Sequence, residues 1–85
     1  MKTILLATDF SDRADRALRR ATLLARQAGA GLRIVHVVDD DQAPDLLAAE
    51  RAQAAALLDR IAATVREVDG IDCTAEVVVA APFLG

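Results

Sequence analysis

Two hydrophobic patterns alternate along this chain. Short, nearly continuous apolar runs are separated by longer segments in which apolar residues recur with helical spacing. The first apolar run covers residues 3–7, Thr-Ile-Leu-Leu-Ala, and stops at Thr8 and Asp9. Strands covered on both faces in a parallel sheet read as nearly continuous apolar runs, so we expect a first strand that is buried on both faces. Residues 32–38 and 73–80 carry similar runs, which predict a second and a third strand.

Between these runs the apolar residues follow a helical period. Ser11 is a suitable N-cap for a helix that Gly29 would end, and a second helix is predicted over residues 44–68, with Pro44 in its first turn and Gly70 after its end. The predicted buried stripes are Ala14, Ala17, Leu18, Ala21, Leu24, Ala25 and Ala28 in the first helix, and Ala54, Leu58, Ile61, Val65 and Val68 in the second.

The resulting order of strand, helix, strand, helix, strand is typical of an α/β domain with a parallel sheet and right-handed crossovers. The 85 residues are enough for one small domain, residues 1–85. The final residues 82–85, Pro-Phe-Leu-Gly, read as the start of another element. We therefore expect a βαβαβ fold that is truncated after its third strand.

Composition narrows the function classes. Hydrophobic residues make up 54% of the chain and aromatic residues only 2%, which predicts an aliphatic, alanine-rich core. A net charge of -3 disfavours nucleic acid and anionic membranes as partners. The single cysteine, Cys73, excludes an intrachain disulfide and is interpreted as a small apolar residue at the start of a strand. With no signal-peptide pattern and no apolar run near the ~20 residues of a membrane span, we expect a soluble cytoplasmic protein.

The leading candidate for chemistry is Asp9, because ligands of open α/β sheets bind at the carboxyl ends of the strands. Its carboxylate could accept hydrogen bonds from ribose hydroxyls or a similar polar ligand. It could equally be a turn residue that bonds its own backbone, and position alone leaves both readings open. Thr8 is a weaker candidate, and a helix cap accounts for Ser11.

Other polar residues favour structural roles. His36 lies in an apolar strand and is interpreted as a satisfied core residue, with no second histidine to form a metal pair. The acidic run at Asp39, Asp40 and Asp41 could hold a divalent cation, but a solvated loop before a helix is the favoured reading. No metal site is therefore predicted.

Catalysis has little support in the sequence. It contains neither a Walker-type loop nor a dinucleotide-binding glycine fingerprint, and it has no serine elbow. A receiver domain needs a phosphorylatable aspartate after the third strand, where this chain has Ala80, Ala81 and Pro82. We predict a protein that is not an enzyme, and a small α/β enzyme of another family is the least favoured hypothesis.

Two segments, taken together, resemble the universal stress protein family. They are Ile-Leu-Leu-Ala-Thr-Asp-Phe-Ser at residues 4–11 and Leu-Arg-Ile-Val-His-Val-Val-Asp at residues 32–39, with the apolar stripe of the first helix and Ala-Gly-Ala at residues 28–30 between them. The resemblance covers essentially the whole chain, as the amino-terminal portion of the family's domain. It implies an adenine-nucleotide α-hydrolase-like fold whose first strand is central in the complete domain.

The resemblance also implies a non-catalytic domain that binds or senses ATP or another adenine nucleotide in the stress response. By analogy, Asp9 contacts the ribose, the backbone of Val37 reads the adenine edge, and Ala7 and Thr8 line the pocket. The family's later glycine-rich motif, which holds the phosphates, is absent from this sequence. We therefore expect that this chain alone does not hold the phosphates.

The alternative is an interaction module of the same family that dimerises without a nucleotide. If the sheet order is third, second, first, the first strand is an open edge that is apolar and uncharged between Thr3 and Thr8. Such edges pair readily with other chains. We therefore expect a homodimer or higher self-association through this strand.

Overall fold

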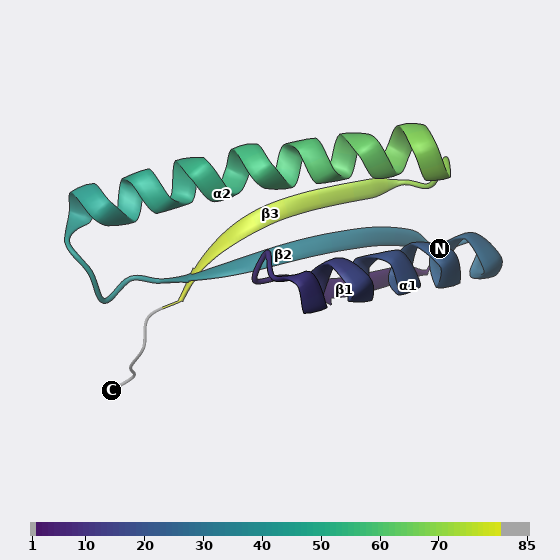
Figure 1. Ribbon diagram of the computed structural model, residues 1–85, viewed down its shortest axis with the longest axis horizontal. Helices are drawn as coiled ribbons and strands as arrows, with labels where there is room; N and C mark the ends of the chain where they lie inside the picture. Colours follow the sequence, from purple (N-terminus) through teal and green to yellow (C-terminus); the bar gives the residue numbers. More distant parts are fainter. Residues whose placement is uncertain (1, 81–85) are drawn as a thin grey trace.

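The computed structural model describes residues 2–80 and confirms the βαβαβ order (Figure 1). Its elements in chain order are β1 (Thr3–Ala7), α1 (Asp12–Ala28), β2 (Gly31–Asp39), α2 (Pro44–Thr64), the π-helical turn η1 (Val65–Asp69) and β3 (Cys73–Ala80). The expected further element at residues 82–85 lies outside the described residues. None of the helices within residues 2–80 is both long and apolar enough to cross a membrane.

The strands form a parallel three-stranded sheet in the order β1-β2-β3, which is the order that leaves β1 at an edge. Residues 3–7 of β1 pair with residues 31–35 of β2, and β3 pairs with β2 along its whole length. Within the described residues, β2 is the central strand.

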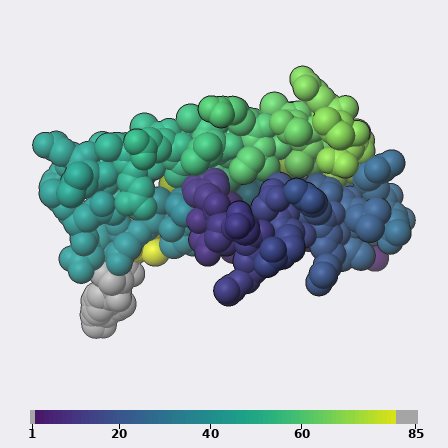
Figure 2. Space-filling view, in the orientation of Figure 1, coloured from purple at the N-terminus to yellow at the C-terminus, as the bar shows by residue number. Residues whose placement is uncertain are grey.

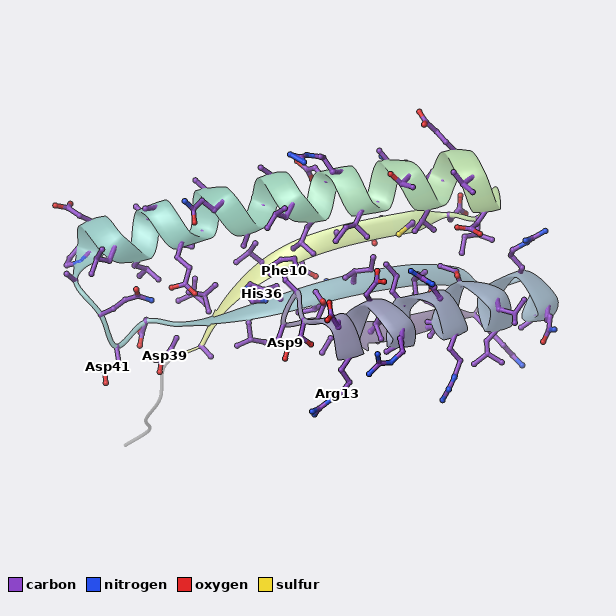
Figure 3. All side chains as sticks on the ribbon, viewed as in Figure 1. Asp9, Phe10, Arg13, His36, Asp39 and Asp41 are labelled. Atoms are coloured by element: carbon purple, nitrogen blue, oxygen red, sulfur yellow. The ribbon has the colours of Figure 1, made fainter. Side chains whose placement is uncertain are left out.

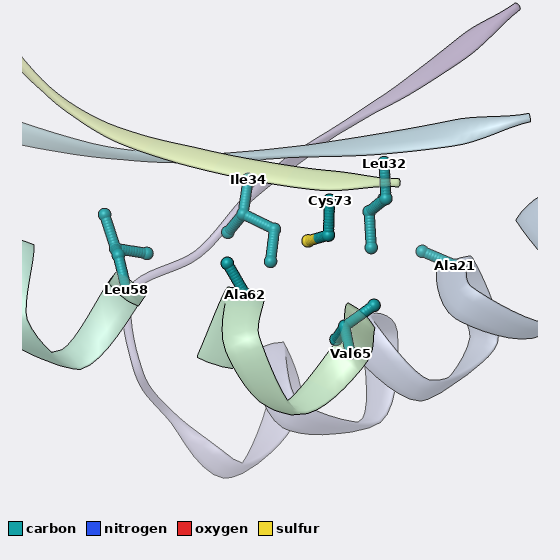
Figure 4. Close-up of a cluster of buried hydrophobic side chains, with 7 residues drawn as sticks. All are labelled: Ala21, Leu32, Ile34, Leu58, Ala62, Val65 and Cys73. Carbon is teal, nitrogen blue, oxygen red and sulfur yellow. The ribbon is translucent and has the colours of Figure 1, made fainter. Parts of the chain in front are cut away.

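Helices α1 and α2 cover the same face of the sheet, and the core lies between that face and the helices (Figure 4). In the space-filling view α1 lies in front of the sheet with α2 beside it (Figure 2). The core is aliphatic, as the composition predicts. Its buried members are Ala21 from α1, Leu32 and Ile34 from β2, Leu58, Ala62 and Val65 from the α2–η1 segment, and Cys73 from β3.

The prediction that β1 is buried on both faces is wrong. Ile4 and Leu6 pack against the core, whereas the alternate side chain of Leu5 is 68% exposed. Both helices lie on one face, and successive side chains of a strand point to opposite faces. The apolar run of β1 therefore includes residues on the second face of the sheet, which no described element covers.

The caps of α1 are as predicted, but its buried stripe is narrower. The Ser11 hydroxyl accepts a hydrogen bond from the Ala14 N–H at 3.2 Å, and Gly29 ends the helix with a positive φ of 65°. Leu24 is 50% exposed, whereas Thr22 is buried and donates its hydroxyl hydrogen to the Arg19 carbonyl at 2.8 Å. The helix thus buries a face centred on Ala21, Thr22 and Ala25, and Ala17 and Ala28 are also exposed.

The predicted second helix is correct to Thr64 and differs in its last turn. Residues 65–69 form η1, a π-helical turn, before Gly70 closes the segment with a φ of 67°. A π turn takes more residues than an α turn, so it rotates the residues that follow away from an α-helical stripe. Val65 is buried, but Val68, the last residue of the predicted stripe, is 74% exposed.

Cys73 has the structural role that was predicted for it. It is a free cysteine buried at the start of β3, and burial raises the pKa of its thiol. No electropositive neighbour was expected, but Arg66 lies nearby and donates a hydrogen bond to the Cys73 carbonyl at 2.7 Å. Its charge opposes the effect of burial on the pKa, which remains raised.

The packing predicts unequal costs for two leucine truncations in α2. Leu58 is 1% exposed, so Leu58→Ala should lower the free energy of unfolding by about 2–5 kcal/mol through lost contacts and a cavity. Leu46 is 63% exposed, and Leu46→Ala should change it by less than about 0.5 kcal/mol. Urea unfolding followed by circular dichroism measures the free energy of unfolding of both variants. Equal losses would contradict the burial of Leu58 in the core.

Candidate functional site

A hollow of about 430 Å³ opens where β1 and β2 end and α1 begins. All four residues that the sequence nominated, Ala7, Thr8, Asp9 and Val37, line it. The other lining residues are Ser11, Arg13, Ala14, Ala17 and His36. The hollow therefore lies at the carboxyl ends of neighbouring parallel strands, where ligands of α/β sheets bind, and its volume falls in the range of small-molecule sites.

The turn between β1 and α1 is held by three successive bonds from backbone N–H groups to side chains. The Thr8 hydroxyl accepts from the Phe10 N–H at 3.1 Å, and the Asp9 carboxylate accepts from the Ser11 N–H at 3.0 Å. Ser11 then caps α1 through Ala14. The turn reading of Asp9 is therefore correct, and this role orients the carboxylate at the rim of the hollow.

Phe10 is the residue at this turn that the sequence reasoning missed. Its φ of 64° places a bulky side chain in the left-handed region, which costs roughly 1–2 kcal/mol. Its ring lies 4.5 Å from the His36 ring, measured between centroids and tilted by 41°, and it packs against the core (Figure 3). An apolar residue just before a helix cap was the available signal, because such a residue needs a place to pack.

His36 has a hydrogen-bond partner within the structure, as expected, but it is only partly buried and is not a member of the core. Its Nδ1 is 2.8 Å from the Thr8 carbonyl oxygen, so Nδ1 carries the proton and donates to that oxygen. The bond ties β2 to the turn that follows β1. His36 therefore positions the rim of the hollow, and its ring also forms part of the lining.

Val37 presents main-chain groups to the hollow. In β2 the odd-numbered residues direct their N–H and C=O groups towards β1, as the bond from the Gly31 N–H to the Lys2 carbonyl shows. This ladder ends where the Thr8 N–H bonds the Val35 carbonyl at 2.9 Å. The N–H and C=O of Val37 therefore point past the end of β1, and its side chain is 53% exposed.

Hydrogen bonds control the charge of Asp9. The largest effect on the pKa of the Asp9 carboxyl is a hydrogen bond with the Ser11 side chain, which lowers it, followed by the bond from the Ser11 N–H. The positive charge of the nearby Arg13 lowers this pKa as well. Asp9 is therefore an anion at neutral pH. It supplies a fixed negative charge and an acceptor to the hollow, while Arg13 on α1 supplies a cation to the lining.

Asp39 and Asp41 lie at the far end of β2, away from Asp9 (Figure 3). The Asp39 carboxylate accepts a hydrogen bond from the Asp41 N–H at 2.9 Å, which is a turn contact. Residues 2–80 bring together no group of three or more histidine, cysteine or acidic side chains that could hold a metal ion.

The Ser11 bonds predict how the Asp9 carboxyl titrates. Its folded pKa lies below the ordinary value of 3.8, so the associated stability is present above that value and is lost as pH falls through the lowered pKa. Ser11→Ala should move the Asp9 pKa upward, whereas Ser11→Thr keeps a hydroxyl and should leave it lowered. Carboxyl-carbon NMR titration measures this, and an unchanged pKa in Ser11→Ala would contradict the assigned cause.

Solved structures of similar fold come from several organisms. "Universal stress protein UspA from Lactobacillus plantarum" superposes with a TM-score of 0.81 at 28% identity, covering 95% of this chain and 62% of that one. A member of the universal stress protein family from Burkholderia pseudomallei superposes with a TM-score of 0.80 at 32% identity, covering 93% and 63%. A universal stress protein in complex with cAMP gives 0.69 at 26% identity, covering 95% and 62%.

The chain thus spans less than two thirds of the length of these relatives. The comparison with curated proteins finds no significant match. The model of the universal stress protein family matches residues 1–83, which is nearly the entire sequence. With the parallel α/β fold and these superpositions, the match shows that this chain belongs to the universal stress protein family.

Proposed function

We propose that the hollow at the ends of β1 and β2 binds the nucleoside part of an adenine nucleotide, and that the protein senses ATP or AMP in the stress response. The observation that carries the proposal is the convergence of Ala7, Thr8, Asp9 and Val37 on one hollow of nucleoside size. These residues come from two strands and the turn between β1 and α1, so the fold creates the site.

Each residue offers a distinct contact. An ionised carboxylate has about four lone-pair positions on its two oxygens, so Asp9 can accept from ribose hydroxyls while one oxygen keeps its bond to Ser11. Within residues 2–80 the N–H and C=O of Val37 have no partner in β1, and they form a donor and acceptor pair that suits the edge of an adenine ring. Ala7 and Ala17 add small apolar surface against which a base can lie.

The similarity to a universal stress protein solved in complex with cAMP supports an adenine nucleotide as the ligand class. The sequence has no glycine-rich phosphate loop, so the proposal concerns the nucleoside and not the phosphates. Adenosine, AMP and ATP should therefore bind with affinities that lie within a few-fold of one another.

The proposal is one of binding without catalysis. The lining offers an anchored carboxylate, main-chain groups and small apolar side chains, and His36 uses Nδ1 to hold the Thr8 carbonyl. We also propose that the protein is located in the cytoplasm, where ATP and AMP are available. The alternative function is a dimerisation module without a nucleotide, which is in keeping with the position of β1 at the edge of the sheet that residues 2–80 form.

The test is calorimetric titration of AMP into residues 1–85 and into Asp9→Asn. Asparagine keeps an oxygen to accept the Ser11 N–H but removes the charge. A neutral amide oxygen accepts hydrogen bonds more weakly than a carboxylate, so Asp9→Asn should weaken AMP binding by roughly 10-fold.

Asp39→Asn is the matched control, because Asp39 makes the same kind of turn contact at the exposed end of β2, outside the hollow. Its affinity for AMP should equal that of the unmodified chain. Absence of AMP binding at millimolar concentration would contradict the proposal, and so would equal weakening by both substitutions.

A further inference from the structure

The outer edge of β3 carries main-chain groups that no described strand satisfies. The Asp72 carbonyl, just before β3, accepts a hydrogen bond from the Leu32 N–H at 2.8 Å, so the even-numbered residues of β3 direct their main-chain groups towards β2. The N–H and C=O groups of Ala75, Val77 and Val79 consequently point away from the sheet. Unpaired groups in such a row are a template for another strand.

This edge lies on the side of the sheet opposite β1. The resemblance to the universal stress protein family implies that the first strand is central in the complete domain, so further strands belong beside β1 and not beside β3. The eight residues of β3 pair one to one with β2, and no bulge interrupts the ladder over residues 73–80. The edge is therefore regular and long enough for an added strand.

A side chain already occupies one end of this edge. The Arg66 guanidinium donates a hydrogen bond to the Cys73 carbonyl at 2.7 Å, and this carbonyl belongs to the outward-facing set. Within the described part of the chain, the main-chain groups of Ala75, Val77 and Val79 have no such partner. An added strand can therefore pair with the edge from Ala75 onwards.

A groove of about 450 Å³, the β3 groove, lies between β3 and α2, which runs along that strand (Figure 1). Val77 lines it from the strand, and it packs against the core, so its side chain faces the helices. The lining from α2 consists of Ala48, Arg51, Ala52 and Ala55. Directly opposed residues of paired strands project from the same face. A side chain opposite Val77 on an added strand would therefore enter the β3 groove.

The β3 groove opens on the side of α2 that faces away from α1. The hollow between the two helices is lined by Leu57 and Ile61 of α2. With 3.6 residues per turn, Ala55 lies almost opposite Leu57 around the helix axis. The β3 groove is therefore separate from the space between the helices and follows the outer edge of the sheet.

The β3 groove contains a cation that can recognise a carboxylate. Neither of the ion pairs formed among residues 2–80 involves Arg51. Arginine binds carboxylates through directional, charge-assisted hydrogen bonds. Asp59 follows Ala55 by one turn on the same side of α2, so a carboxylate is favoured at the Arg51 end of the groove and disfavoured at the other. The alanine side chains offer apolar surface to the stem of a glutamate.

We propose that β3 docks an extended segment of a partner protein as an added antiparallel strand, with a glutamate opposite Val77 that lies in the β3 groove and pairs with Arg51. The outward main-chain groups of β3 hold the segment, and the contact with Arg51 selects it. In the antiparallel arrangement, the residue opposite Val77 exchanges both hydrogen bonds with it. This inference does not depend on nucleotide binding.

Fluorescence anisotropy of a labelled peptide with the 85-residue chain tests the docking. The peptide Thr-Val-Thr-Glu-Thr-Val-Thr places its valines and its glutamate on one face, and a second peptide has glutamine in place of glutamate. Arg51→Gln should weaken binding of the glutamate peptide roughly five-fold and leave the glutamine peptide unchanged. Arg60→Gln is the matched control, because Arg60 is exposed on α2 outside the β3 groove, and it should bind both peptides normally.

Amide hydrogen exchange measured by NMR locates the added strand. The outward N–H groups of Ala75, Val77 and Val79 should exchange roughly tenfold more slowly when about nine-tenths of the chain is bound, since exchange then proceeds from the free fraction. Slowing at the edge of β1 instead would overturn the proposal. So would slowing at β3 that rises with protein concentration alone, which would make a second copy the occupant. Equal weakening by both arginine substitutions, or no binding of the glutamate peptide at millimolar concentration, would also overturn it.

Discussion

The rest of the structure depends on one constraint, which is that both crossover helices lie on the same face of the sheet. Successive crossovers of one hand that step in one direction across a sheet place their helices on one side. The order β1-β2-β3 has this property, and the buried residues of α1, α2 and the strands form a single cluster on that side. Within the described residues, a one-sided core and an open sheet face both follow from it.

The same constraint explains where the site lies. Parallel strands end at one edge of the sheet, and α1 starts directly after β1, so the turn at residues 8–11 must stand above the ends of β1 and β2. Local side-chain bonds fix this turn, and the contact of Phe10 with His36 offsets the strain of its backbone. For Asp9, the structural and functional readings are therefore compatible, because the turn bond orients the carboxylate at the hollow.

What the sequence predicts well is what short-range chemistry determines. Ser11 and Gly29 mark the ends of α1 because caps act over one turn, and the strand runs are recognisable from apolar side chains alone. Leu5, Leu24 and Val68 were misjudged because burial depends on which faces the other elements cover. The contact of Phe10 with His36 joins residues far apart in sequence, so no local pattern could reveal it.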